Sequence, residues 1–343
     1  MEILRCSTVE CFPDGMVVAV LRYMAPLISI IIPTYNRAKY VTRAIAAIQS
    51  QAFTAWELIV VDDGSSDGTA EVLPAIAAGD ARIQYVRQAN AGVSVARNTG
   101  IKAMHPDTRY IMFHDDDDWL TEDGLTRLSA LATAFPDAPA VVGLPLHCDD
   151  NGYSTDTLAT CYGAKRIAVG VSGLAENVPF GAPETFASMV IWCGIATPAL
   201  ALIRRDAFAK TGGFVTRCQP SEDWLLWLDL TRQGDIPRTG TFTLNKRVHP
   251  GAVTQNGKVM SAGEPAVRRE VLMLTGITPQ QRLVSLQGYL LSSLANASWA
   301  VEDFRNRNAI SGLKQVYRML KRMVRIGRFW ATTYRIQPAA SAG

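Results

Sequence analysis

Hydrophobic and polar positions alternate between two patterns from residue 27 to about residue 143. Continuous apolar, β-branched runs, typical of strands buried on both faces, are followed by segments with apolar residues at helical spacing. The apolar runs lie at 27–33, in the first part of 56–69, at 82–88 and at 109–115. The helical segments lie at 38–51, at 67–78 with Asp67 as the expected cap, and at 92–104. This alternation predicts an α/β fold with a mostly parallel sheet covered by helices.

Polar and acidic residues follow the predicted strands. "PTYNR" comes after the first strand, "DDGSSD" after the second and "DDDDW" after the fourth. In parallel sheets ligands bind beyond the carboxyl ends of the strands. The consecutive aspartates at 115–118 repel one another and need a positive partner. Carboxylates suit a hard divalent cation, and together with the basic and polar segment 90–100 they indicate a metal-bound nucleoside diphosphate.

Other readings of these residues are weaker. No glycine-rich dinucleotide fingerprint and no ATPase-type phosphate loop follows the first strand. A calcium loop of the EF-hand type lacks its glycine and its closing glutamate. A solvated surface turn remains an alternative for the aspartates. We expect His114 to be a hydrogen-bonded core histidine, and Trp224 and Trp227 to pack a helix.

Composition sets limits on class and compartment. The 343 residues are 48% hydrophobic and 19% charged, with a formal net charge of +3, which indicates a globular chain and disfavours a nucleic-acid binder. Six scattered cysteines form no Cys-x-x-Cys pair, so free thiols in a reducing compartment are expected. We find no signal-peptide pattern and no membrane-spanning run, and therefore expect a cytoplasmic location, with peripheral contact to the inner face of the plasma membrane as an open alternative.

The later part of the chain is less patterned. Residues 198–214 predict a strand, a helix and a turn, and a further helix is expected to begin after Ser221, with Glu222 and Asp223 in its first turn. The segment 311–335 is amphipathic, and residues 301–343 hold nine Lys or Arg against two acids. Such a helix either lies on an anionic membrane surface or packs on its own domain, and both readings stay open.

Six segments, in order and with their spacing, resemble the inverting family 2 glycosyltransferases, which have the GT-A fold. They are "SIIIPTYNRAKYVTRAIAAIQSQ", "ELIVVDDGSSDGT", "NAGVSVARNTGI", "YIMFHDDDDWL", "GGF" at 212–214 and "SEDWLLWL" at 221–228. The resemblance covers roughly residues 27 to 250. It implies transfer of a sugar from a nucleoside-diphosphate sugar, most simply a UDP-sugar, to a hydroxyl of a glycan or lipid-linked acceptor.

The resemblance also assigns roles by position. Nucleotide-sugar contacts fall on Pro33, Thr34, Tyr35, Asp62, Asp63, Arg97, Asp115, Asp116 and Arg247. Asp62 and Asp63 would read the uracil and ribose, and Arg97 would lie near the base and the diphosphate. Asp117 would bind Mn²⁺ or Mg²⁺, with His249 as a second candidate ligand, and Asp118 would support them. Asp223 would be the catalytic base of a single displacement.

The lack of pattern before residue 24, the resemblance up to about residue 250 and the basic amphipathic segment beyond it together predict three regions. Residues 1–23 form a peripheral extension, 24–260 the glycosyltransferase domain, and 261–343 a helical basic extension. The domain divides into a nucleotide-sugar half, 24–143, and an acceptor half, 144–260. Two alternatives from other classes are disfavoured. A nucleotidyltransferase needs a glycine-rich basic loop after the first strand, and a non-catalytic sugar-nucleotide binder is expected to lack Asp117 or Asp223.

Overall fold

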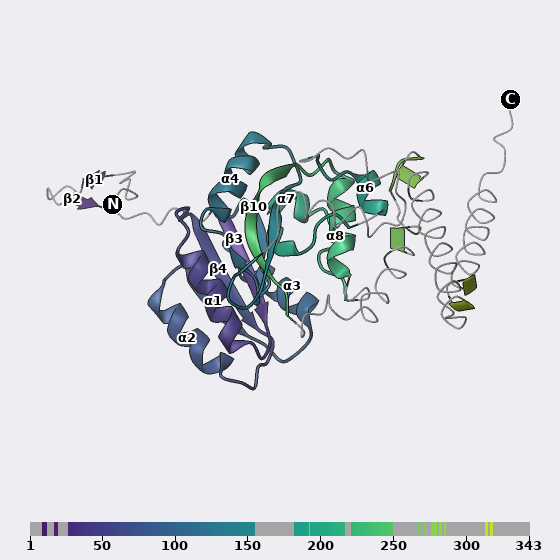
Figure 1. Cartoon of the computed structure of the whole chain (residues 1–343). Helices are drawn as coiled ribbons and strands as arrows, with labels where there is room; N and C mark the ends of the chain where they lie inside the picture. Colours follow the sequence, from purple (N-terminus) through teal and green to yellow (C-terminus); the bar gives the residue numbers. More distant parts are fainter. Residues whose placement is uncertain are drawn as a thin grey trace, which may run out of the picture.

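The computed structural model describes residues 9–11, 17–19, 27–154, 182–191, 193–216 and 221–249, with scattered positions between 267 and 317. Near the N-terminus, β1 (Val9–Cys11) and β2 (Val17–Ala19) pair antiparallel as a separate two-stranded sheet. The main body is a sheet with helices packed against it (Figure 1).

The main sheet has eight strands in the order β5-β4-β3-β6-β9-β8-β10-β7. Their bounds are β3 Ile28–Thr34, β4 Trp56–Asp62, β5 Ile83–Arg87, β6 Tyr110–Phe113, β7 Trp119–Leu120, β8 Ala140–Cys148, β9 Ala201–Arg204 and β10 Arg238–Arg247. Strands β5, β4, β3 and β6 are parallel, β9 is antiparallel to both neighbours, β10 is parallel to β8, and β7 is antiparallel to β10. The predicted mostly parallel α/β sheet is confirmed.

The described helices are α1 Ala38–Gln49, α2 Thr69–Gly79, α3 Val93–Ala103, α4 Gly124–Ala134, α6 Phe186–Ile191, α7 Arg205–Phe208 and α8 Glu222–Thr231, with a 3-10 turn at Pro198–Leu200. Helices α1, α2, α3, α7 and α8 lie where the sequence predicts helices, whereas α4 and α6 were not predicted. Asp67 lies one residue before the N-cap of α2, yet its carboxylate accepts a hydrogen bond from the Thr69 N–H at 3.0 Å. Ser221 occupies the N-cap position of α8, but its side chain makes no capping hydrogen bond.

The direction of the chain through the sheet reverses between β3 and β6. From β3 the chain moves outward through β4 to β5, and then returns to add β6 on the other side of β3. Right-handed crossovers therefore place α1 and α2 on one face of the sheet and α3 on the other. Such a reversal opens a crevice at the carboxyl ends of the two strands, where ligands bind in sheets of this kind.

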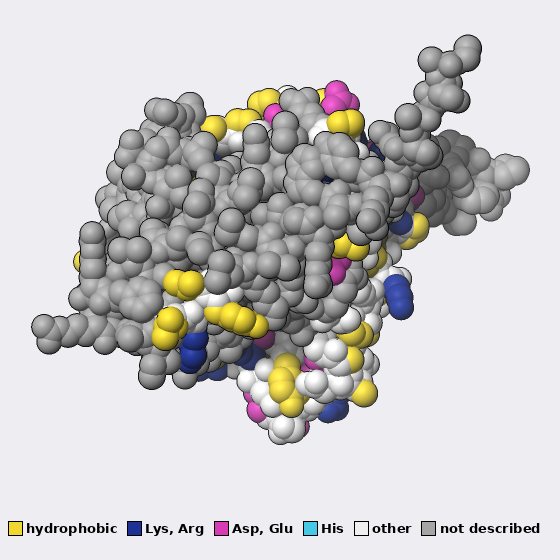
Figure 2. All heavy atoms as spheres, turned by 90° about the vertical axis from the view of Figure 1, so that its right-hand side faces the viewer, with side chains coloured by type: hydrophobic (Ala, Val, Ile, Leu, Met, Phe, Trp, Pro, Cys, Tyr) yellow, Lys and Arg dark blue, Asp and Glu magenta, His cyan; other side chains and the backbone are white. Residues whose placement is uncertain are grey.

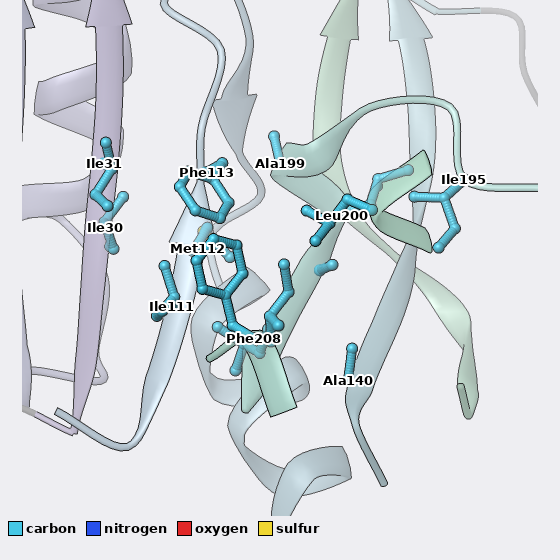
Figure 3. Close-up of a cluster of buried hydrophobic side chains, with 14 of the residues drawn as sticks. Ile30, Ile31, Ile111, Met112, Phe113, Ala140, Ile195, Ala199, Leu200 and Phe208 are labelled. Carbon is cyan, nitrogen blue, oxygen red and sulfur yellow. The ribbon is translucent and has the colours of Figure 1, made fainter. Parts of the chain in front are cut away.

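The core explains why the strands read as continuous apolar runs. All seven residues of β3 are buried, because helices cover both faces of the sheet. At the end of β6, the centroid of the Phe113 ring lies 5.6 Å from that of Phe208 (Figure 3). The Phe113 ring also packs edge-on against the Phe214 ring, at 4.7 Å between centroids. These contacts fix the segment after α7 against the strand that leads into the aspartates.

Two predictions about the organisation of the chain can be compared with the structure. The division at 143/144 falls inside β8, so both proposed halves share one continuous sheet. Of the segment 311–335, the structure describes only residues 313, 314, 316 and 317, all helical, so the choice between membrane contact and packing stays a prediction. Much of the face in Figure 2 likewise belongs to residues outside the described ranges. No described helix has both the length and the apolar character needed to span a bilayer.

Substituting Gly100 tests the packing of α3 on β3. A Cβ on Gly100 would collide with the Ile31 side chain. We expect Gly100→Ala to lower the free energy of unfolding by roughly 1–3 kcal/mol, because a tightly packed core tolerates an added methyl group poorly. Thermal or urea denaturation measures the change.

Gly79→Ala, at the end of α2, is the matched control, since nothing lies within 4 Å of its Cβ position. This control should leave stability unchanged or raise it by up to about 1 kcal/mol. Equal stability of the two variants would contradict the described packing.

Candidate active site

The site lies at the crevice between β3 and β6. Thr34 ends β3, and its hydroxyl donates to Asp116 at 2.7 Å, so the two strand ends are joined directly. The aspartates at 115–118, here called the acidic loop, follow β6 immediately. The predicted cluster at the carboxyl ends of the strands is therefore present.

The acidic loop is matched by cationic and hydroxyl groups of the protein itself. The Asp115 carboxylate accepts hydrogen bonds from the Arg97 guanidinium at 3.0 Å and from the Thr197 hydroxyl at 2.6 Å. Asp117 pairs with Arg37 at 2.6 Å. Side chains of the protein itself therefore supply part of the positive charge that these aspartates need.

Asp118 is also matched by a cationic group and a hydrogen-bond donor of the protein. Its carboxylate accepts the Arg247 backbone N–H at 3.0 Å and lies 3.6 Å from the Lys246 ammonium. Burial nevertheless raises the pKa of Asp118 to about 7, with the nearby Asp115 and Asp117 acting in the same direction. Burial, and then the Asp117 charge, raise the pKa of Asp116 to about 7 as well. Although burial opposes it, the attraction of Arg97 and Lys246 holds the pKa of Asp115 below its ordinary value.

Asp117 and His249 converge on one point. The imidazole Nε2 of His249 lies 3.1 Å from the same Asp117 oxygen that Arg37 contacts. Mg²⁺ in nucleotide enzymes is held by one or two carboxylates together with substrate phosphates, and carboxylates also suit Mn²⁺. Within the described ranges no group of three or more potential ligands converges. The donor set therefore fits a cation shared with a diphosphate better than a cation held by protein alone.

Arg247 makes its described contacts within the protein. Its guanidinium is buried, lies 3.5 Å from the Tyr40 ring centroid, and pairs with Asp150 at 2.9 Å. Its Nε donates to the Asp117 carbonyl oxygen at 3.2 Å. Arg247 thus holds the backbone of the acidic loop, and contact with a diphosphate stays a prediction.

Asp62 and Asp63 end β4 and organise the neighbouring loops. Asp62 is fully buried, accepting from the Ser65 N–H at 2.8 Å and the Tyr85 hydroxyl at 2.9 Å. Asp63 accepts from the Gln88 amide and from backbone N–H groups of residues 91 and 92. Their described contacts are internal, so nucleotide recognition by either carboxylate remains untested.

Residues at the end of β3 and in the loop that follows it differ in how far their side chains are exposed. Pro33 lies within buried β3, whereas the Tyr35 side chain is 47% exposed. Asn36 has a positive φ of 54°, and its side-chain oxygen accepts from the Ser66 N–H at 2.7 Å. This turn holds the Tyr35 ring out where a flat base could contact it.

The first turn of α8 faces the acidic loop through Arg97. Arg97 is 5% exposed and donates from one nitrogen to Glu222 at 2.8 Å and from the other to Asp115 at 3.0 Å. Burial first, and then the adjacent Glu222, raise the pKa of Asp223 to about 7, while Arg97 opposes the shift. Burial, which an isolated sequence position does not reveal, therefore takes the pKa of Asp223 well above that of an ordinary aspartate.

Comparison with known protein families assigns the chain to one of them. A family model described as Glycosyl transferase family 2 matches residues 29–212, more than half of the chain. The chain belongs to glycosyl transferase family 2. The predicted resemblance is confirmed.

The relatives match over short regions. Glycosyltransferase GlyA of Streptococcus pneumoniae is 40% identical over 96 residues, which is 28% of this chain and 14% of the relative. EpsJ of Bacillus subtilis, an uncharacterized glycosyltransferase, is 42% identical over 106 residues, 31% of this chain and 30% of the relative. Chondroitin synthase of Escherichia coli is 36% identical over 100 residues, which is 29% of this chain and 14% of the relative. Each alignment thus covers less than a third of the relative.

Solved structures share the fold. Staphylococcus aureus TarS 1–349 in complex with UDP-GlcNAc has a TM-score of 0.56 at 16% identity, covering 80% of this chain and 72% of that chain. The mannosyltransferase PcManGT from Pyrobaculum calidifontis, in complex with GDP-Man and Mn²⁺, has a TM-score of 0.53 at 16% identity, covering 88% and 87%. Together with the family match, these likenesses confirm the GT-A fold.

Several contributors to this family 2 site were missed by sequence reasoning. Arg37 lies within "PTYNR" and Lys246 within "NKR", so both stood inside segments already singled out. Thr197, 82 positions from Asp115, carried no recognisable signal. The expected structural roles of other residues hold: Trp224 and Trp227 are buried, and His114 is buried with its Nδ1 2.7 Å from the Asp115 carbonyl oxygen.

Replacing Asp223 should stabilise the protein at alkaline pH. The fold raises the pKa of Asp223 from 3.8 to about 7, so the folded protein binds this proton more tightly than the unfolded chain. Stability is therefore lost as pH rises from about 4 to about 7, and the deficit persists above that range. We expect Asp223→Asn to raise Tm at pH 8 by roughly 2–4 °C, and by less at pH 5.

Asp229→Asn is the matched control on the same helix, because Asp229 pairs with Arg232 at 3.0 Å away from the acidic loop. Differential scanning fluorimetry across pH measures both variants. A pH-independent effect of Asp223→Asn would contradict the raised pKa.

Proposed function

We propose that the chain transfers a sugar from a nucleoside-diphosphate sugar to a hydroxyl group of a glycan or lipid-linked acceptor, with inversion at the anomeric carbon. Membership of glycosyl transferase family 2 supports the reaction class. The observation that carries the mechanism is Asp223, a carboxyl group with a pKa of about 7 that Arg97 and Glu222 link to the acidic loop. A general base works best when its pKa lies near the operating pH.

The donor lies, in this proposal, in the crevice between β3 and β6. The exposed Tyr35 ring covers the nucleotide base, and the joined Thr34 and Asp116 face the ribose. A UDP-sugar is the proposed donor, as the resemblance implies. TarS has been crystallised with UDP-GlcNAc and PcManGT with GDP-Man, so the choice of base needs a direct binding comparison.

The chemistry follows from placing a base opposite a leaving group. Asp223 takes the proton from the acceptor hydroxyl as its oxygen forms a bond to the anomeric carbon. The bond from that carbon to the diphosphate oxygen breaks at the same time, and its electron pair leaves with the nucleoside diphosphate. Proton removal of this kind contributes roughly 10²- to 10⁴-fold in rate.

Asp117 and His249 are the proposed ligands of Mn²⁺ or Mg²⁺. Such a cation, when bound, neutralises charge on the departing diphosphate. Arg247 fixes the Asp117 backbone, and Lys246 balances the buried Asp118 beside it. These contacts hold the backbone that carries the Asp117 carboxylate, which itself contacts Arg37 and His249.

The chain divides, in the same proposal, into a peripheral segment 1–23, a transferase domain 24–260 and a basic helical extension 261–343. The family match at 29–212 lies entirely inside the proposed domain. The acceptor would be bound by the side of the domain that carries α8.

Asp223→Asn should separate catalysis from binding. The amide keeps the size of the side chain and the acceptor for the Trp224 N–H, but it cannot take a proton. We expect transfer to fall by at least roughly a hundredfold while the affinity for UDP with Mn²⁺ stays within about twofold. A radiolabelled transfer assay and calorimetry measure the two quantities. Transfer at the parent rate would show that the base lies elsewhere, with Glu222 the next residue to change.

Metal dependence is tested at Asp117. We expect nucleotide affinity to fall at least roughly tenfold in EDTA, because the cation links the carboxylate to the diphosphate. Asp117→Ala should abolish this metal effect without unfolding the protein, as judged by circular dichroism. Asp137→Ala, an exposed position before β8, is the control and should bind like the parent. Equal nucleotide affinity with Mn²⁺ and with EDTA in the parent protein would contradict the proposed metal site.

A further inference from the structure

Arg97 is a charged side chain buried inside the domain. It projects from α3, is 5% exposed, and its guanidinium carbon lies 4.7 Å from the Phe214 ring centroid. Removing a guanidinium from water is unfavourable by several kcal/mol unless carboxylates and hydrogen bonds compensate it. Here the two terminal nitrogens each meet a different carboxylate, Glu222 at 2.8 Å and Asp115 at 3.0 Å.

The two carboxylates belong to segments that are far apart in sequence. Glu222 stands 125 positions from Arg97 and is the immediate neighbour of Asp223 in the first turn of α8. Asp115 begins the acidic loop that carries Asp117, and its second oxygen is held by Thr197. The planar guanidinium of Arg97 thus bridges the first turn of α8, which carries the proposed base, and the acidic loop, which carries the proposed metal ligand.

We propose that Arg97 and Glu222 are positioning residues that hold the first turn of α8 against the acidic loop. They thereby determine where Asp223 lies and the pH range in which it acts as a base. The inference rests on the proposed function. It differs from the role that resemblance implies for Arg97, which is direct contact with the donor. In the structure both terminal nitrogens of the guanidinium are engaged by protein carboxylates.

The charges around Asp223 give this arrangement a measurable consequence. The charged groups that face it are Glu222 on α8, Arg97 on α3 and Asp115 in the acidic loop. Glu222 has one oxygen on Arg97, and its other oxygen, which is buried, has no hydrogen-bond partner among the described residues. After burial, the Glu222 charge contributes most to raising the pKa of Asp223, and Arg97 opposes it. Removing that negative charge should therefore lower the pKa of Asp223.

Glu222→Gln is the most informative variant, because the amide oxygen still accepts from Arg97 and the fold is expected to persist. We expect the acidic limb of the pH profile of kcat/KM to move about one pH unit lower, since a like charge next to Asp223 is gone. At pH 8, kcat should fall roughly tenfold, because the base is weaker and the link to the acidic loop is neutral. The dissociation constant for UDP with Mn²⁺ should stay within about twofold of the parent.

Two further variants complete the set. Arg97→Lys keeps a positive charge but not the two-pronged fork, so it should also lower kcat with little change in the donor KM. Asp229→Asn removes a negative charge from α8 without touching Arg97 and should leave the pH profile in place. An unchanged profile in Glu222→Gln, or a loss confined to donor affinity in either Arg97→Lys or Glu222→Gln, would overturn the proposal.

A readout without substrate keeps the inference separate from the proposed function. The carboxyl carbon of Asp223 can be followed by NMR in protein labelled with ¹³C-aspartate, assigned by its absence in Asp223→Asn. We expect its titration midpoint to be lower in Glu222→Gln than in the parent. If the parent transferred no sugar from any donor, the proposed function would fail, whereas an unchanged midpoint would overturn the coupling between Glu222 and Asp223.

Discussion

A buried guanidinium shared by two carboxylates is the interaction on which the arrangement of this site depends. Arg97 cannot lie in the interior without compensation, and the groups that compensate it come from the end of β6 and the start of α8. Folding that satisfies Arg97 therefore also brings Asp223 to face the acidic loop. One buried guanidinium thus links the segment that carries the proposed base to the segment that carries the proposed metal ligand.

The acidic loop shows how a fold tolerates adjacent like charges. Each aspartate has its own partner group: a hydroxyl from β3, arginines from two helical segments, and a lysine from β10. The compensation is incomplete, and burial leaves the pKa of Asp116 and of Asp118 at about 7. These carboxyl groups lie at the switch point of the sheet, where a GT-A protein is expected to bind its donor.

Much of the fold could be predicted because buried parallel strands and amphipathic helices have distinct periodicities. The strands up to residue 115 and their three helices follow from apolar runs and helical spacing. By contrast, β10 reads "RTGTFTLNKR", in which no continuous apolar run marks a central strand, and its place between β8 and β7 depends on pairing across the chain. The candidate site residues could be placed by motif, but their partners could not. Arg37 with Asp117 and Arg97 with Glu222 are pairs formed only by folding, and the raised pKa of Asp223 follows from burial and from the adjacent Glu222.

We propose that Arg97 is an internal link and not a donor ligand, and a crystal structure of the protein with Mn²⁺ and UDP tests this directly. We expect that the guanidinium still bridges Asp115 and Glu222, that Mn²⁺ lies on Asp117 and His249, and that Asp223 faces the diphosphate without touching the metal. A structure in which Arg97 leaves Glu222 to bind the diphosphate, or in which Mn²⁺ lies away from Asp117, would contradict it.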